Sequence, residues 1–217
     1  RHWQSAVRHH LYGRHGCPQG KADQDQTAQK GGGTLNKKYE ISEIAHPRYP
    51  WLHRIRALTE FRPGVRPGDL GGYVQSEENL SQEDVCWIFD NAIACEGCLV
   101  DHQAIIADSV VVRGSAFVAG TVTVRDNAVI DDHAILMAGM VRGHAHVAGT
   151  AEIVASMESG EAPLVEGHAS VYGDVTGAVK VKDAAVILPG VTIDNPTHDV
   201  FVVQQDKVTV ERTYQRL

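Results

Sequence analysis

Aliphatic residues recur at every sixth position through the middle of the chain. Eight of the nine residues in this series are branched aliphatics, whereas the series displaced by two positions contains none. A third series, displaced by four positions, is apolar and mostly small. Because side chains two positions apart point to the same side of a strand, each hexad sends one small and one aliphatic side chain inward. The aliphatic series is Ile88, Ala94, Val100, Ile106, Val112, Val118, Val124, Ile130 and Leu136.

Short polar pairs such as Asp-Asn, Gly-Ser and Asp-His stand between these apolar positions, and such pairs favour turns. A strand that turns every six residues and keeps one side inward coils into a parallel β-helix with three hexads per coil. The series slips by one residue after Leu136, is interrupted at residues 154–164, and resumes at Val165. It predicts nineteen hexads up to His198, or about six coils, with 154–164 either a degenerate hexad or a protruding loop.

The same pattern divides the chain into four predicted parts. Residues 1–35 lack apolar periodicity and are predicted to be a disordered leader or linker. Residues 36–84 alternate enough for short strands and contain tight-turn pairs, which predicts an N-terminal β cap. Residues 85–198 form the β-helix. Residues 199–217 resemble a closing β hairpin, as expected because solenoids need end caps.

Charge and composition exclude several classes of function. Residues 82–217 carry 8 basic and 19 acidic groups, a balance of −11, which repels phosphate backbones and argues against a nucleic-acid partner. No run of 18 apolar residues is present, so no membrane association is expected. Four cysteines in 217 residues are too few for a disulfide scaffold, which favours reduced thiols and a cytoplasmic location.

Cys95 and Cys98 have the two-residue spacing of a metal knuckle, but no second such pair follows. The hexad pattern places Cys98 and Cys86 at small inward positions and Cys95 at an outward one. Buried cysteine behaves as a small apolar residue. The sequence therefore predicts core thiols and no metal site.

The hexads resemble the left-handed β-helix of the hexapeptide-repeat acyltransferase superfamily over residues 88–198, including Ile187-Leu-Pro-Gly-Val-Thr-Ile193. A narrower string is similar to the YdcK-like bacterial and prophage-borne proteins, which are named as acyltransferases. The fold expected from pattern and resemblance is all-β: a left-handed parallel β-helix with a cap at each end. The narrower string comprises Leu52-His-Arg-Ile-Arg-Ala-Leu58, Pro67-Gly-Asp-Leu-Gly-Gly-Tyr-Val74, Ser76-Glu-Glu-Asn-Leu-Ser81 and Cys86-Trp-Ile-Phe-Asp-Asn-Ala92.

The resemblance implies transfer of an acyl group from acyl-coenzyme A, such as acetyl-coenzyme A, to a small hydroxyl or amine acceptor. It also implies a histidine base, because a base must titrate near working pH to deprotonate the acceptor. Counting hexads in threes puts His133, Thr150 and His168 on one corner and Asn127 with His144 on another. His144 is the first candidate base, since it precedes the irregular 154–164 segment, and His133 is the second. Cofactor-binding residues are not identified.

A non-catalytic reading stays open beside the enzyme. The glycine-rich basic tail that binds the cofactor in the superfamily is not evident, and the acidic body offers a pyrophosphate little attraction. The alternative is a non-catalytic β-helix that serves as a scaffold or interaction protein. A prophage origin is one form of this alternative.

Self-association is expected in either case. The residue between the two inward positions of a hexad must point outward, and in the early hexads it is apolar in seven of eight instances. A continuous apolar band on a monomer invites association, and the resemblance implies a homotrimer. The band comprises Ile93, Leu99, Ile105, Val111, Phe117, Val129 and Ile135.

Overall fold

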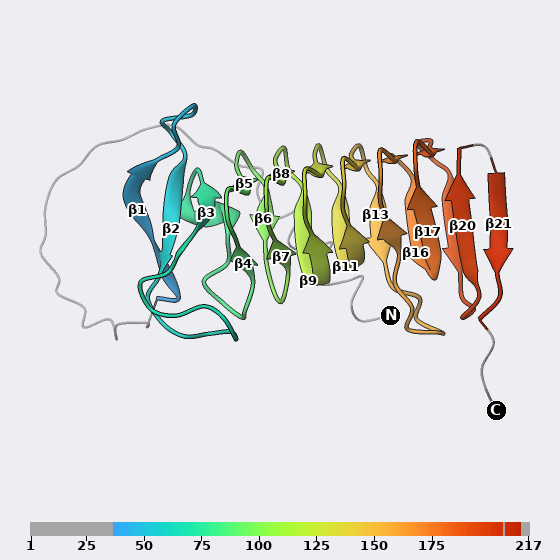
Figure 1. Ribbon diagram of the computed structural model, residues 1–217, viewed down its shortest axis with the longest axis horizontal. Coiled ribbons are helices and arrows are strands. Elements are labelled where there is room, and N and C mark those ends of the chain that lie inside the picture. Colours follow the sequence, from blue (N-terminus) through green and yellow to red (C-terminus); the bar gives the residue numbers. More distant parts are fainter. Residues whose placement is uncertain (1–36, 206, 214–217) are drawn as a thin grey trace, which may run out of the picture. The chain divides into compact units, whose positions relative to one another are not determined.

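The computed structural model describes residues 37–205 and 207–213, and these form a parallel β-solenoid preceded by antiparallel strands. Successive coils stack side by side from β3 to β20 (Figure 1). The predicted leader, residues 1–35, lies outside the described residues. The all-β solenoid is therefore confirmed, while its handedness and the leader stay predictions.

Face 1 of the solenoid holds seven parallel strands, one for each coil. The sequence predicted about six coils, because its series began at Ile88. The structure adds an earlier coil, in which Tyr73 and Val74 pair in parallel with Ile93 and Ala94. The strands of face 1 are β3 (Leu70–Val74), β5 (Ile93–Ala94), β8 (Val111–Val112), β10 (Val129–Ile130), β12 (His146–Val147), β15 (Ser170–Val171) and β18 (Val186–Ile187).

Face 2 begins with a single bridge from Leu80 to Val100 and continues through the next six coils. Two of its strands run on around the following corner into face 3, at Gly120 and Gly139, whose φ angles are +64° and +96°. A Cβ at Gly120 would lie 2.1 Å from the Met137 carbonyl oxygen, so only glycine fits this close approach. Face 2 contains β6 (Leu99–Val100), β9 (Phe117–Val124), β11 (Ile135–Val141), β13 (Glu152–Val154), β16 (Asp174–Gly177) and β19 (Thr192–Asn195).

Face 3 closes each coil. The second halves of β9 and β11 lie in this face, between the earlier and later short strands. The remaining strands are β4 (Trp87–Ile88), β7 (Ile105–Ile106), β14 (Leu164–Val165), β17 (Val179–Lys182) and β20 (Val200–Gln204). We call the corners edge 1–2, edge 2–3 and edge 3–1, after the faces that they join in chain order.

The core is the stack of inward residues that the hexads predicted. All nine residues of the aliphatic series are fully buried, and so are most of their small partners. Each level of the stack rests on the same kind of residue in the coils before and after it, so burial is continuous along the solenoid. The seven residues of the predicted apolar band are partly buried, because neighbouring coils flank each of them.

Two segments that carried the narrower resemblance have structural roles. The 3₁₀ helix η1 (Glu77–Asn79) shapes the first corner, and its Asn79 is fully buried. The Asn79 amide donates to the carbonyls of Glu96 and Cys98, and so ties the first coil to the second. Gly72 lies so close to Ala92 that a Cβ would be 2.4 Å from its carbonyl oxygen. These motifs therefore specify how the first coil is built.

The N-terminal cap consists of β1 (Tyr39–Ala45) and β2 (His53–Ala57), which pair antiparallel with each other, while β2 pairs antiparallel with β3. At the other end, β20 pairs antiparallel with β21 (Lys207–Glu211). The predicted hairpin is thus present, and β20 is also the face 3 strand of the last coil. Sheet pairing runs without interruption across the predicted boundaries at residues 84 and 198.

Candidate functional site

His144 and His168 lie together on edge 3–1, in neighbouring coils. Their rings stack with centroids 4.9 Å apart, and the His144 N–H donates to the Gly167 carbonyl at 2.7 Å. The placement of His168 on the corner of His133 was therefore wrong. That count treated residues 154–164 as a hexad, whereas 155–163 form a loop on edge 2–3 between β13 and β14 and add no strand to any face.

Edge 3–1 also gathers basic side chains next to these histidines. Arg142 donates to the Glu166 carboxylate from Nε at 3.0 Å and from Nη2, and the Lys180 ammonium lies 3.1 Å from the same carboxylate. The hydrogen bond from Arg142 is the main reason that the pKa of Glu166 is held below its ordinary value. Two cations share one anion here, so the group of three carries one net positive charge.

His133 lies apart from this cluster, on another edge of the solenoid. It is exposed on edge 1–2, where its N–H donates to the Gly149 carbonyl at 2.9 Å. The Thr150 turn follows it one coil later, as predicted. Among the described residues no imidazole or carboxylate contact of the His133 ring is found, so the structure adds no feature that favours it as a base.

The loop between β13 and β14 is held in one shape by its own hydrogen bonds. Ser156 is buried, and its hydroxyl accepts from the N–H groups of Glu158 and Ser159, each at 3.2 Å. Its own N–H donates to the Glu161 carbonyl at 2.8 Å. Met157 is 91% exposed at the tip. Of the two alternatives predicted for 154–164, a degenerate hexad or a protruding loop, the structure has the loop, and it lies on a different edge from His144.

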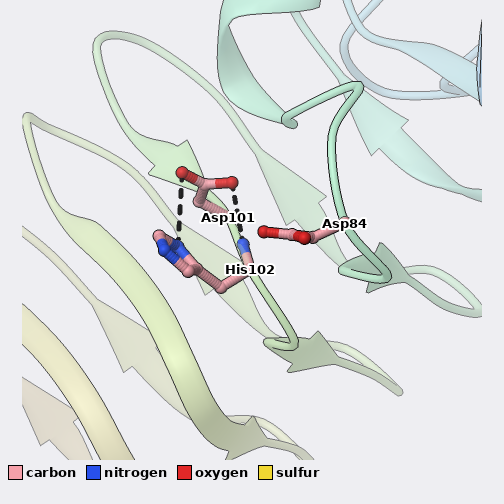
Figure 2. Close-up of side chains that lie close together, drawn as sticks. All are labelled: Asp84, Asp101 and His102. Atoms are coloured by element: carbon pink, nitrogen blue, oxygen red, sulfur yellow. Dashed lines mark hydrogen bonds and ion pairs between the residues drawn. The ribbon is translucent and has the colours of Figure 1, made fainter.

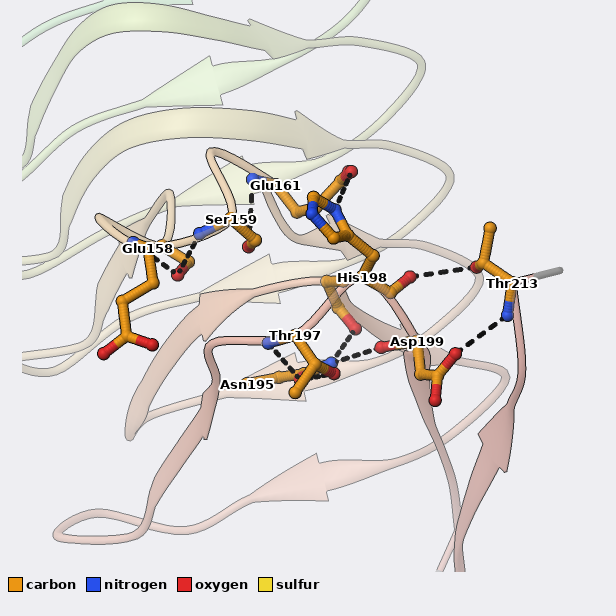
Figure 3. Close-up of polar contacts among 10 residues, drawn as sticks. Glu158, Ser159, Glu161, Asn195, Thr197, His198, Asp199 and Thr213 are labelled. Carbon is orange, nitrogen blue, oxygen red and sulfur yellow. Dashed lines mark hydrogen bonds and ion pairs between the residues drawn. The ribbon is translucent and has the colours of Figure 1, made fainter. Parts of the chain in front are cut away.

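The side chain that this loop meets is His198. The His198 Nδ1 lies 3.1 Å from the Glu161 carboxylate, and both side chains are about half exposed (Figure 3). A carboxylate at Nδ1 favours the tautomer that carries its proton there, which leaves Nε2 free to accept a proton. This is the arrangement of an oriented general base.

The turn that carries His198 is held in place by hydrogen bonds of Asn195, which is fully buried. The Asn195 amide donates to the carbonyls of Ala178 and Asp199 at 2.8 and 2.6 Å, and its oxygen accepts from Thr197. Thr213 closes the group from the end of β21, donating to the His198 carbonyl and to Asp199 (Figure 3). The imidazole is therefore mounted on a hydrogen-bonded turn.

Asp84, Asp101 and His102 form the grouping of metal-binding side chains found among the described residues, with ligand atoms within 4.8 Å of one another (Figure 2). Asp101 accepts from the His102 N–H at 2.7 Å, and its other oxygen lies 3.4 Å from the His102 Nδ1. The buried Lys38 ammonium interacts electrostatically with both carboxylates. Because the protein itself supplies this compensating charge, we regard the grouping as a contact between the cap and the first coils.

Lys38 and Cys86 form a buried pair beneath this contact. The ammonium donates to the Cys86 sulfur at 3.2 Å and to the carbonyls of Glu83 and Cys86. Burial lowers the pKa of Lys38 and raises the pKa of Cys86, and the contact between them opposes both shifts. The pair joins β1 to the start of face 3.

Cys98 and Cys95 lie as the hexads predicted. Cys98 is buried and its thiol contacts the Val112 carbonyl at 3.4 Å, while Cys95 is partly exposed. Burial raises the pKa of Cys98 to about 12. Ligation of a metal requires the thiolate, which this burial disfavours, and the absence of a metal at these cysteines stays a prediction.

Comparison with known proteins adds no assignment: no protein-family model matches the chain, and no curated protein matches it. In the described part of the chain no helix is long and apolar enough to cross a membrane.

In the sequence, His198 marked the end of the predicted hexads, and its contact with Glu161 was not predicted. The sequence nevertheless contains two irregular turns that indicate this contact. The hexads are interrupted at 154–164, and the turn after Ile193 is again longer than the usual four residues. Both irregularities fall on edge 2–3, two coils apart, so their side chains can meet across the intervening coil.

Proposed function

We propose that the protein transfers an acyl group from acyl-coenzyme A to a small hydroxyl or amine acceptor, with His198 as the general base. The observation that carries the proposal is the contact of His198 Nδ1 with Glu161 on the protruding loop. This base replaces His144 as our first candidate, because the loop overhangs His198. The coiled, three-faced solenoid and the resemblance of its hexads to the acyltransferase superfamily support the same reaction class.

The residues around face 3 offer complementary parts of such a site. Strand β14 connects the loop on one side to Glu166, Arg142 and Lys180 on the other. Glu161 and Glu166 are five residues apart, so at ~3.3 Å per residue they lie within about 17 Å along the chain. The net positive charge beside Glu166 suits the phosphates of a coenzyme A thioester, which bears its reactive carbonyl at the far end of a long arm.

The chemistry at His198 is then an ordinary acyl transfer. The acceptor hydroxyl or amine gives its proton to Nε2 as its oxygen or nitrogen bonds to the thioester carbonyl carbon. The carbon–sulfur bond breaks next, and the imidazolium returns the proton to the departing thiolate. Glu161 orients the imidazole through Nδ1, and this contact strengthens as positive charge develops on the ring in the transition state.

The first test is calorimetry of the full chain with acetyl-coenzyme A, followed by turnover with a panel of hydroxyl and amine acceptors. We expect His198→Ala to lower kcat by about 10²-fold or more with little change in KM, because general acid–base catalysis contributes 10²–10⁴-fold. His133→Ala is the matched control, as an exposed edge histidine without a carboxylate partner, and should keep wild-type activity.

His144→Ala separates the two candidate bases. If that variant loses activity and His198→Ala does not, the base is His144 and the present assignment is wrong. If millimolar acetyl-coenzyme A gives no heat and no acceptor turns over, the enzyme proposal fails and the β-solenoid scaffold becomes the better account.

We further propose that the early coils associate with other copies through the apolar band, as a homotrimer. The band residues each begin a strand, are distributed over all three faces, and keep part of their surface exposed in the isolated chain. Apolar surface in a continuous strip favours burial against a partner.

A further inference from the structure

The free edge of β21 at the C-terminal end of the solenoid is the feature from which we draw a second, independent inference. All five residues of β21 are exposed, and within the described residues β20 is its one strand partner. The chain then turns back toward β20, where Thr213 donates to Asp199. An open strand edge is a template for pairing with another strand.

The hydrogen-bonding groups of this edge can be identified from strand parity. The Phe201 N–H donates to the carbonyl of Ala178, the residue before β17, so in β20 the main-chain groups of Val200, Val202 and Gln204 face β21. Their partners in β21 are Glu211, Thr209 and Lys207. The main-chain groups of the two remaining residues, Val208 and Val210, therefore point away from β20 toward the open edge.

We propose that β21 pairs antiparallel with β21 of a second copy of this chain, about a two-fold axis at Thr209. In this arrangement Val208 lies opposite Val210 of the second copy, and the two residues exchange both of their hydrogen bonds. The main-chain donors and acceptors of the open edge are then all satisfied. Closed two-fold contacts are the commonest in homo-oligomers.

The charges of the strand fit the same arrangement. The sequence Lys-Val-Thr-Val-Glu is complementary to its own reverse, so Lys207 lies opposite Glu211 of the second copy, once on each side of the axis. Opposite charges across a strand pair stabilise it and like charges destabilise it. Displacing the pairing by two residues loses both ion pairs, and a parallel arrangement places Lys207 beside Lys207.

Apolar side chains at this end of the solenoid are exposed in the single chain, and a second copy would bury them. Val208 and Val210 lie across from Val203 and Phe201, on the side of the sheet that faces the core. They are 59% and 55% exposed because no coil follows. The inward residue Val191 of the last coil is 42% exposed for the same reason, whereas the matching Ala151 is buried. Two copies joined through β21 would bring these uncovered core ends together.

The experiment is a charge exchange followed by sedimentation of the full chain across a concentration series. Wild-type protein should assemble into species with an even number of chains. Lys207→Glu or Glu211→Lys alone should weaken that step at least about tenfold, since each places like charges opposite one another at two points. The double variant Lys207→Glu/Glu211→Lys restores both pairs with reversed sign and should recover wild-type assembly.

A backbone variant serves as the second measurement. Val210→Pro removes an N–H that faces the open edge and leaves the hydrogen bonds to β20 in place, as proline on an edge strand allows. It should abolish the even-numbered species, with its thermal melt confirming that the solenoid is intact. The proposal is overturned if wild-type protein is monomeric or purely trimeric, if the single exchanges assemble normally, or if the double exchange does not recover. None of these outcomes depends on the acyltransferase proposal.

Discussion

The aspartates of edge 3–1 offer a quantitative test of how the coils are joined. Asp126 has a φ angle of +63°, in the left-handed region that non-glycine residues rarely adopt. Its carboxylate accepts from the Gly143 N–H of the next coil at 2.9 Å, and its own N–H donates to the Asp108 carboxylate of the coil before, also at 2.9 Å. Asp126 thus forms the turn and also bonds to both neighbouring coils.

Three substitutions at Asp126 separate these two contributions. Asp126→Asn keeps an acceptor and tolerates the left-handed region, so it should cost less than about 0.5 kcal/mol. Asp126→Gly keeps the conformation but loses the hydrogen bond, a net loss of about 1 kcal/mol. Asp126→Ala loses the bond and adds about 1–2 kcal/mol for a left-handed alanine, so its total is about 1.5–3.5 kcal/mol.

The Arg125 contacts to Asp126 and Asp108, at 3.7 and 3.8 Å, change this ranking little, because all three side chains are more than 40% exposed. Asp183 provides the matched control. Its φ is +57° on the same edge, but within the described part of the chain its carboxylate accepts no bond from a following coil. Asp183→Ala should therefore show the conformational cost alone, about 1–2 kcal/mol.

Thermal melts measure these differences, since about 1 kcal/mol shifts Tm by roughly 2–4 °C in a protein of this size. We expect the order of Tm to be Asn, then Gly, then Ala at position 126, with Ala lowest by about 3–14 °C. The reasoning is refuted if Asp126→Ala has the same Tm as Asp126→Asn. It is also refuted if Asp126→Ala lowers the Tm by no more than Asp183→Ala does.

Two further predictions concern edge 3–1 and the apolar band. The lowered pKa of Glu166 means that its ion pairs stabilise the fold above its ordinary pKa of 4.5 and lose that contribution as the pH falls through the lowered value. Glu166→Gln should therefore melt about 1–4 °C below wild type at pH 7, and this difference should shrink progressively as the pH falls below 4.5. Arg142→Gln should show the same pH dependence. Leu99→Glu/Phe117→Glu should reduce the proposed trimer to smaller species in sedimentation without unfolding the chain, and a trimer that survives this double variant would remove the band as its interface.

The sequence alone predicted which residues form the core, because that information is local. Inward and outward positions follow from a six-residue period and from strand alternation, so Ile130 and Leu136 could be assigned without knowing where the coil began. The same alternation placed Cys98 in the core and Cys95 outside it.

The first coil was harder to recognise, because its corner is built by different means. The 3₁₀ helix η1 (Glu77–Asn79) makes this corner in place of an Asp-Asn or Gly-Ser pair, and the buried Asn79 side chain holds it by accepting from the N–H groups of Gln75 and Ser76. The small position of this coil's first hexad is filled by Gly72, which approaches Ala92 of the next coil too closely for any side chain, and Gly71 lies equally close to Ile55 of the cap and to Ile88. A pattern of aliphatic spacing does not detect such a coil, although its residues pair in parallel with those that follow.

Only the tertiary structure decided which histidines share an edge. Edge assignment depends on a running count in threes, so one uncertain segment displaces every later residue. Treating 154–164 as a hexad moved His168 away from His144, which it contacts. The pairing of Glu161 with His198 likewise joins residues 37 positions apart, through a loop whose shape is set by hydrogen bonds of Ser156. Periodicity determines the direction of each side chain, but the lengths of the irregular turns determine which side chains meet.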